Sequence, residues 1–296
     1  MRAFSYLLAL LACALKGLTM PIHVTPADDL AAAIVRARAG DRHVILHGGA
    51  YYETALTLTA EDRGLTLEAA PGETPVLYGG RRVTGWRQDG AWWRADAPGV
   101  KDGAWDFRHL VVNGGLRMRA RLPRHGAFTH ENTFDVRWMS TTGGGWERKP
   151  TEAELTTMRY RPGDLGAWLD IRNAELTIFH QWDESVVGIT ALDPATRTVI
   201  FSNPAGHPPG AFGGWNAKAR TYVVWNARQG MTEPGQWYLD RANGAVYYWP
   251  LPGEEFATTE IIAPTTERII RLEGTEAAPV TAVTLRGLTL TATTTP

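Results

Sequence analysis

The segment His-Gln-Trp-Asp-Glu-Ser at residues 180–185 gathers side chains that contact sugars in proteins. An indole ring packs on the C–H face of a sugar, while imidazole and carboxylate groups bind its hydroxyls. If the segment is part of a strand, alternation places His180, Trp182 and Glu184 on one face, so we expect these residues and Asp183 to contact saccharide. The alternative is that Trp182 packs in a core with the polar residues at its edge, since large aromatic side chains are most often buried.

Asp183 and Glu184 are also a candidate pair of carboxylates for acid–base catalysis. Glycoside hydrolysis needs one protonated and one ionised carboxyl, about 5 Å apart for retention and further apart for inversion. Neighbouring side chains in a strand point to opposite faces, so these two carboxylates cannot flank one sugar together. Either of them could still reach a shared cleft from the rim of its domain.

The sequence lacks the motifs of several other catalytic and metal-binding sites. No G-x-S-x-G segment surrounds any of the serines, which excludes the usual nucleophile elbow. No H-E-x-x-H or C-x-x-C segment is present, and we predict no metal site and no cofactor. The formal net charge of -1, from 30 basic and 31 acidic residues, provides no basic surface for phosphate groups. Nucleic acid is therefore not expected as a partner.

The first 20 residues have the pattern of a secretory signal peptide. Arg2 precedes an apolar run at residues 4–11, and the small residues Ala12-Cys13-Ala14 follow it. The run is too short to span a membrane, so we predict export to the periplasm, the cell surface or the surroundings of a bacterium, without a transmembrane span. Cys13 is the only cysteine, which excludes an internal disulfide. Because Leu10-Leu-Ala-Cys13 resembles a bacterial lipobox, a lipid anchor through Cys13 is an alternative.

Two stretches of the chain repeat short apolar strands separated by Gly, Pro or Asp. The strands lie at residues 44–46, 56–58, 65–68 and 76–78 in the first stretch, and at 261–262, 269–272, 283–285 and 287–290 in the second. Such repeats are typical of solenoid coils, each of which stacks on its neighbours to bury its apolar face. A helix predicted at residues 28–39, with Leu30, Ile34 and Val35 on one face, would cover the open end of the first coil.

The sequence between these stretches is rich in tryptophan and has the turn signals of antiparallel strands. The dipeptides Asp193-Pro194 and Asn243-Gly244 each predict a hairpin. Residues 131–158 lack a periodic pattern and predict a long loop with a short helix near residues 151–154.

Together these patterns predict an all-β protein. Its architecture is an incomplete parallel β-helix interrupted by an antiparallel β-sandwich-like insertion, with a short N-terminal capping helix. We place the signal peptide at residues 1–20, the capping helix and first coils at 21–107, the insertion at 108–235, and a hairpin with the returning coils at 236–296.

Several motifs resemble those of right-handed parallel β-helix glycoside hydrolases. They are Ala69-Ala-Pro-Gly-Glu-Thr-Pro-Val76, Gly79-Gly80, Val83-Thr-Gly-Trp86, Leu110-Val-Val-Asn113, Ala120-Arg121, Tyr160-Arg-Pro-Gly-Asp-Leu165, His180-Gln-Trp-Asp-Glu-Ser185 and Trp237-Tyr-Leu-Asp240. On these motifs the chain resembles glycoside hydrolase family 141 and, more loosely, family 120, whose β-helix carries an inserted β-sandwich domain. The resemblance extends over nearly the whole chain after the signal.

The resemblance implies a secreted, carbohydrate-active protein, the N-terminal portion of a glycoside hydrolase. It also implies cleavage of plant or host polysaccharide, at fucoside or xyloside linkages, by a carboxylate pair on coils after the insertion. The acids from Ile261 onward, Glu267, Glu273 and Glu276, match no catalytic motif of the family. The catalytic residues are therefore unknown, and we expect them beyond Pro296.

Two other functions are alternatives to glycoside hydrolysis for this sequence. A non-catalytic module could bind polysaccharide through the tryptophan-rich region, and an exposed, coplanar row of tryptophans would favour it. A polysaccharide lyase would need a base and usually a cation that neutralises a uronate. The sequence contains no basic or calcium-loop cluster for that chemistry, so the lyase is the least favoured of the three.

Overall fold

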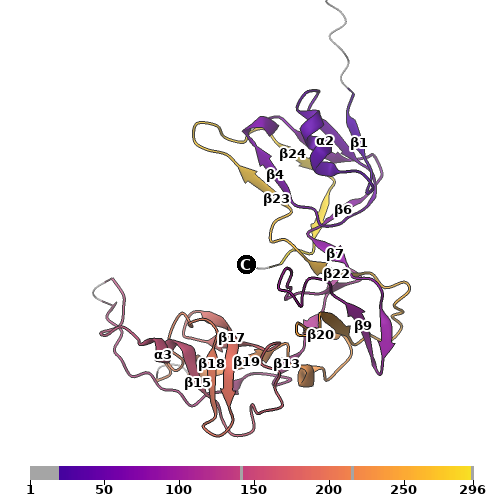
Figure 1. The fold of residues 1–296 in the computed structure, drawn as a ribbon. Coiled ribbons are helices and arrows are strands. Elements are labelled where there is room, and N and C mark those ends of the chain that lie inside the picture. The colour runs from indigo at the N-terminus through magenta and orange to yellow at the C-terminus, as the bar shows by residue number, and fades with distance from the viewer. Residues whose placement is uncertain (1–19, 141–142, 215–216, 295–296) are drawn as a thin grey trace, which may run out of the picture. The chain divides into compact units, whose positions relative to one another are not determined.

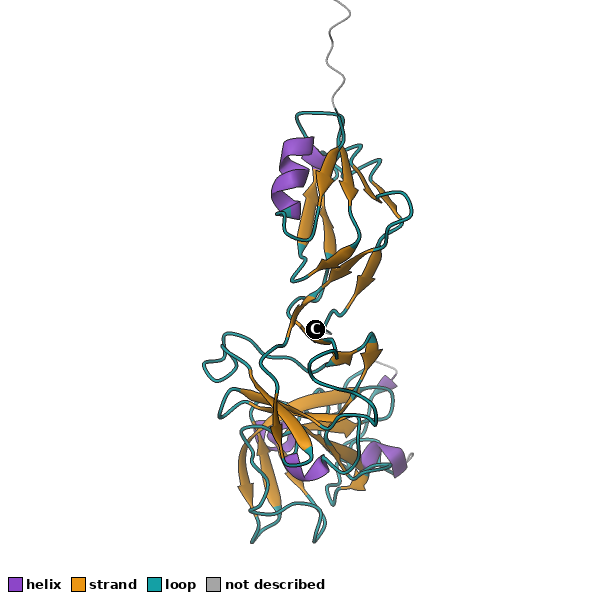
Figure 2. Cartoon of the chain, turned by 90° about the vertical axis from the view of Figure 1, so that its right-hand side faces the viewer, coloured by secondary structure: helices purple, strands orange, loops and turns teal. Residues whose placement is uncertain are grey.

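The computed structural model describes residues 20–140, 143–214 and 217–294. The predicted signal peptide, apart from Met20, lies outside the described residues, as does the lipid anchor considered at Cys13. No helix in the described part of the chain is long and apolar enough to span a membrane. The chain is mostly β, as predicted, and forms two compact units (Figures 1 and 2).

Unit 1 joins the chain before Val83 to the chain after Ile261. Its strands are β1 (Ile22–Val24), β2 (His43–Leu46), β3 (Gly49–Tyr51), β4 (Leu56–Thr59), β5 (Thr66–Ala69), β6 (Pro75–Tyr78), β7 (Gly80–Arg82), β22 (Ile261–Pro264), β23 (Ile270–Glu273), β24 (Thr284–Arg286) and β25 (Thr289–Thr291). Parallel sheets run in the orders β1-β2-β5-β24 and β25-β6-β3, and β23 pairs in parallel with β4. Strand β7 pairs antiparallel with β22. Every apolar strand predicted for the two repeat stretches coincides with or overlaps one of these strands.

The core of unit 1 consists of aliphatic side chains at alternating strand positions. Val44 and Leu46 of β2, Leu58 of β4 and Leu67 of β5 are fully buried, and the residues between them are more exposed. This alternation directs one face of each strand inward. The short 3-10 helix η1 (Ala60–Asp62) follows β4.

Helix α2 (Leu30–Ala37) packs Leu30 and Ile34 into the same core. The predicted helix is thus confirmed, but it is shorter than residues 28–39, because Asp29 caps it by accepting a 2.9 Å hydrogen bond from the Ala32 N–H. Val35, which the sequence pattern assigned to the buried face, is 54% exposed. It follows Ile34 directly, and one residue turns the side chain by more than a quarter of the helix circumference.

Unit 2 contains residues 83–261 and is built on two main sheets. The first has the order β12 (Met118–Arg119), β20 (Gln236–Asp240), β21 (Ala245–Tyr248), β9 (Trp92–Asp96) and β8 (Arg87–Asp89). The second has the order β13 (Arg121–Leu122), β19 (Thr221–Trp225), β16 (Glu175–Phe179), β17 (Glu184–Asp193), β18 (Thr198–Phe201) and β15 (Thr157–Arg159), and β14 (Phe128–Thr129) also pairs with β19. The smaller elements are β10 (Val111–Val112), β11 (Gly115–Leu116), α3 (Glu152–Thr156), η3 (Ala217–Arg220) and η4 (Arg228–Gly230).

Each main sheet of unit 2 has its own buried side chains. In the first sheet, Trp237 is fully buried, its ring stacks on Phe107 with centroids 5.4 Å apart, and its Nε1 donates to the Arg117 carbonyl. In the second, Leu176, Ile178 and other apolar side chains pack together on one face. The residues that alternate with them point to the opposite face, which carries the polar groups described below.

The compact units divide the chain at other positions than the sequence pattern indicated. Residues 108–235 were predicted as the insertion, whereas unit 2 extends from residue 83 to residue 261. The reason is that β8 and β9 pair with β20 and β21 in one antiparallel sheet, so segments on both sides of the predicted boundaries belong together. Both predicted hairpins and the short helix near residue 151 are present, as β17–β18, β20–β21 and α3.

Candidate functional site

The segment expected to contact sugar forms a hairpin turn. Strand β16 ends at Phe179 and β17 begins at Glu184, and the His180 N–H donates to the Asp183 carbonyl at 2.9 Å to close the turn. The predicted continuous strand is therefore wrong. His180, Trp182 and Glu184 do not share the face of one strand, and each has a different environment.

His180 is buried inside this turn. Its Nε2 lies 2.8 Å from Ser185 Oγ, which in turn accepts a 2.9 Å hydrogen bond from the Gly206 N–H. Burial lowers the pKa of His180 to about 4, and the opposing effect of the Asp183 charge is weaker. The imidazole is therefore neutral at pH 7 and holds the turn together, whereas the sequence had suggested a direct contact with sugar.

Trp182 is the most exposed of the tryptophans that the structure describes, at 68%, and Trp168 follows at 45%. The alternative considered above, that Trp182 packs in a core, is thus wrong. Its ring makes an edge contact with Phe212 at 4.8 Å between centroids. Phe212 in turn packs against Trp138, Trp146 and His207, and we call these five aromatic residues the tip cluster.

Asp183 and Glu184 are both exposed beside the tip cluster. Asp183 Oδ2 lies 3.5 Å from Nε2 of His207, and Glu184 pairs with Phe179 across the hairpin. The tip of the β16–β17 hairpin therefore presents an accessible indole beside two carboxylates. The other described tryptophans form no exposed row, since Trp93 and Trp237 are buried and the remainder, apart from Trp168, are half-buried.

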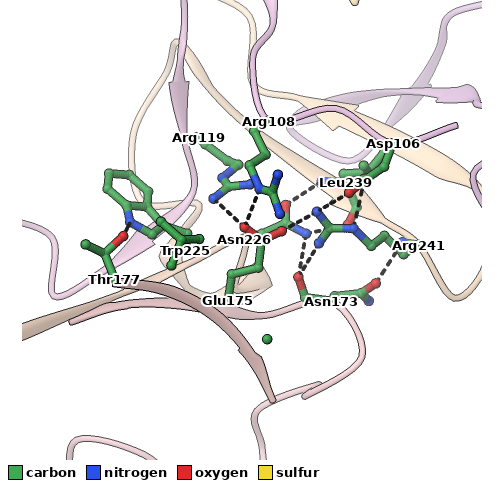
Figure 3. A network of polar contacts seen from close by, with 12 residues as sticks. Asp106, Arg108, Arg119, Asn173, Glu175, Thr177, Trp225, Asn226, Leu239 and Arg241 are labelled. Carbon is green, nitrogen blue, oxygen red and sulfur yellow. Dashed lines mark hydrogen bonds and ion pairs between the residues drawn. The ribbon is translucent and has the colours of Figure 1, made fainter. Parts of the chain in front are cut away.

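A second polar cluster surrounds Glu175, the first residue of β16 (Figure 3). Its Oε2 accepts hydrogen bonds from Arg108 Nε at 2.9 Å and from Arg119 Nη2 at 3.2 Å, and its Oε1 accepts from Arg241 Nη2. The Glu175 side chain is only 8% exposed. Arg119 belongs to β12 and Arg241 follows β20, so the carboxylate links the two main sheets of unit 2.

The charges of this cluster keep Glu175 ionised. Burial alone would raise the pKa of the carboxyl, but the positive charges of Arg119 and Arg241 and the hydrogen bond from Arg108 outweigh it and lower the pKa to about 2. Arg241 is shared with Asp106, which accepts from its Nε at 2.9 Å. A carboxyl held in this way does not act as a general acid near neutral pH.

Asn226 continues the polar network between the sheets. Its Nδ2 donates to the carbonyls of Asn173 and Leu239, and its Oδ1 accepts from the Leu239 N–H, each at 2.8 Å. The side chain is fully buried, and its backbone has a φ of 57°. Asparagine tolerates this left-handed conformation better than most residues, which explains its presence at the end of β19.

A depression of about 290 Å³ opens beside Glu175. Its polar lining consists of Arg108, Arg172, Glu175, Ser202, Asn203 and Arg241. The sequence analysis did not identify this place, because its residues come from segments that only the folded chain brings together. The described residues contain no group of three or more His, Cys, Asp or Glu side chains arranged to hold a metal ion.

Comparison with known proteins assigns the family. Residues 90–251 match the family model of the GH141 insertion domain, and the chain belongs to this family. The matched region lies within unit 2 and includes both the tip cluster and the Glu175 cluster. No curated protein matches the sequence.

Two solved structures are similar in fold. One, titled "Glycoside hydrolase", has a TM-score of 0.67 and 22% identity, and the match covers 93% of this chain and 51% of that chain. This chain thus spans about half the length of that protein. The other, "The complex structure of XylC with xylose", has a TM-score of 0.37 and 14% identity over 94% of this chain and 36% of that one.

Proposed function

We propose that this chain is part of an exported, carbohydrate-active protein of the glycoside hydrolase type. Its membership of the GH141 insertion-domain family supports this proposal, as does the fold it shares with a protein titled "Glycoside hydrolase". In this proposal the parallel sheets of unit 1 are the first coils of a parallel β-helix, α2 caps them, and unit 2 is the inserted domain. The substrate is a plant or host polysaccharide with fucoside or xyloside linkages.

Unit 2 contacts the saccharide at the tip of the β16–β17 hairpin. The observation that carries this assignment is the exposed indole of Trp182, which makes an edge contact with Phe212. A sugar ring packs its C–H face on such an indole, and the carboxylates of Asp183 and Glu184 accept hydrogen bonds from its hydroxyls. His180 fixes the turn from inside and does not touch the ligand.

The proposal places the catalytic carboxylate pair outside the residues that the structure describes. Asp183 and Glu184 adjoin each other at an open hairpin tip, which gives no enclosed site for a sugar between them. Glu175 is ionised by its arginines and cannot supply the proton that the leaving group needs. In this proposal unit 2 binds saccharide, and these three carboxylates do not carry out the hydrolysis.

The substitution Trp182→Ala tests this binding role. We expect it to weaken binding of xylan and fucosylated oligosaccharides by at least ~10-fold, because a central tryptophan contact contributes about 2 kcal/mol or more. Titration calorimetry with the full chain measures the affinity. Trp168→Ala is the matched control, since Trp168 is also exposed but lies outside the tip cluster. Equal affinities of the Trp182→Ala variant and the unchanged chain would show that the tip does not bind saccharide.

A further inference from the structure

The depression beside Glu175 has a polar lining that the proposed function does not use. Arg172 is the most exposed of its cations, at 72%, but its Nε and Nη2 are bound to Asp170. The Arg108 side chain is 45% exposed. Its Nε donates to Glu175, and no hydrogen bond from its Nη1 or Nη2 to another described residue is seen. A guanidinium in this position offers two parallel N–H groups to a planar oxyanion.

Charged groups of both signs surround the depression. The cations are Arg108, Arg119, Arg172 and Arg241, and the anions are Asp106, Asp170, Glu175 and Asp240. His109 adds no charge at pH 7, because burial lowers its pKa, and Arg119 and Arg108 lower it further. These charges balance, so the preference for an anionic ligand rests on the terminal nitrogens of Arg108, which Glu175 leaves open.

The floor of the depression has room for a ligand because residue 188 is glycine. Gly188 faces Glu175 in the register of β16 and β17. A Cβ atom at Gly188 would lie 2.4 Å from Ser202 Oγ, so the missing side chain keeps the hydroxyl accessible. Ser202 Oγ and Asn203 both line the same space and are able to bind sugar hydroxyls.

The depression and the hairpin tip are connected along one strand. By alternation, Val186 and Glu184 share the face of β17 that carries Gly188, and both are exposed. From residue 188 to residue 184, where β17 begins, the strand spans about 13 Å, and Trp182 lies in the turn just before it. One oligosaccharide that lies along this edge would reach both Trp182 and Arg108.

We propose that the depression is a subsite for the oxyanion of an acidic sugar, either the carboxylate of a uronic acid or a sulfate ester. Arg108 binds the two oxyanion oxygens through its terminal nitrogens, and Ser202 and Asn203 hold the hydroxyls of the same sugar. This subsite rests on the proposed function, because it assumes that unit 2 binds saccharide. It narrows the ligand to an acidic polysaccharide.

The test compares charged and neutral forms of one probe on the full chain. The probes are an α-1,4-linked galacturonic acid trimer, its methyl ester, and a galactose trimer that carries sulfate. We expect the acid to bind about tenfold more tightly than its ester, and Arg108→Gln to remove that preference, because a charge-assisted hydrogen bond is lost. If the sulfated trimer binds more tightly than the acid, the oxyanion is a sulfate; the reverse order assigns a carboxylate.

Two further variants separate a binding effect from a loss of folding. Gly188→Ala fills the floor without a charge change and should weaken binding of the acid, while Arg124→Gln removes an exposed charge of unit 2 elsewhere and should leave it unchanged. Far-ultraviolet circular dichroism checks that each variant is folded.

The outcomes also distinguish this subsite from the hairpin tip. Trp182→Ala should weaken binding of the acid and the ester alike, whereas Arg108→Gln should affect the acid alone. Equal affinity of the unchanged chain for acid and ester overturns the subsite but leaves the tip intact. No binding of any of the three probes by the unchanged chain also overturns the subsite.

Discussion

The substitution Glu175→Gln is expected to lower the free energy of unfolding of unit 2 by about 3–5 kcal/mol, since it leaves the buried Arg119 without a counter-charge, while Arg241 keeps Asp106. Arg119 is itself only 8% exposed, and within the described chain Glu175 is the carboxylate to which it donates. The lowering of the Glu175 pKa from 4.5 to about 2 gives a similar magnitude, about 3 kcal/mol. Urea unfolding followed by tryptophan fluorescence reports on unit 2, because every tryptophan of the sequence lies within residues 86–249.

The matched control is Asp96→Asn. Asp96 also contacts two arginines, Arg87 and Arg94, but its side chain is 62% exposed. Exposed ion pairs contribute only about 0–1 kcal/mol, so the control should change stability by no more than that. A comparable loss in both variants would mean that burial does not set the strength of the Glu175 cluster.

The same carboxylate gives a defined dependence on pH. Because the pKa of Glu175 is lower in the folded chain, its contribution is fully present above pH 4.5 and is lost as the pH falls toward about 2. The unchanged chain should therefore lose stability across this range more steeply than the Glu175→Gln variant. Parallel curves for the two proteins would contradict the assignment.

The second large effect is expected for Asn226→Ala. The substitution leaves the N–H and C=O of Leu239 without these partners in a fully buried position, while the C=O of Asn173 keeps its hydrogen bond from Arg241 Nη1. Each such group costs about 1–3 kcal/mol, and alanine also tolerates the positive φ less well. We expect unit 2 to lose about 3–5 kcal/mol of unfolding free energy in the same urea experiment.

Asn113→Ala separates the backbone effect from the lost hydrogen bonds. Asn113 has a similar φ of 49° and accepts one hydrogen bond from the Glu260 N–H, but it is exposed. Its replacement should cost about 1–2 kcal/mol, mainly through the left-handed conformation. If the two alanine variants lose the same stability, the buried bonds of Asn226 contribute nothing and the network does not stabilise the pairing of the sheets.

The strands of unit 1 could be predicted because their signal is local. Leu56 and Leu58 alternate with threonines, and the corresponding buried and exposed sides are found in β4. The same alternation of apolar and polar residues predicted the strands near both ends of the chain. Which strand pairs with which is not local information, and the pairing of β24 with β5 appears only in the fold.

The hairpin at residues 180–183 was missed because its turn signal is weak, with Asp183 as its one common turn residue. No glycine, proline or asparagine lies between Phe179 and Glu184, so the pattern continued through it as a strand. The turn is closed by the backbone bond from His180 to Asp183 and by the side-chain contact of His180 with Ser185. The segment thus has a different geometry from the predicted strand, and the role of its four residues in binding stays a prediction.

The Glu175 cluster has almost no signature in the sequence. Its one local sign is a carboxylate at the start of an otherwise apolar strand, Glu175-Leu-Thr-Ile-Phe179. The arginines that neutralise it lie 56–67 residues away in the chain. Side chains so far apart cannot be matched by spacing, and only the pairing of the sheets selects Arg108, Arg119 and Arg241 among the many basic residues.

The nested arrangement of the units sets an order for folding during synthesis. Strands β4, β5 and β6 leave the ribosome well before their partners β23, β24 and β25, because the whole of residues 83–261 is made in between. The edges that these late partners occupy stay unpaired until residues 262–294 have been made. Contacts between such distant segments also form slowly. A nascent chain halted before residue 262 would display those unpaired edges, which makes it a natural client for a holding chaperone.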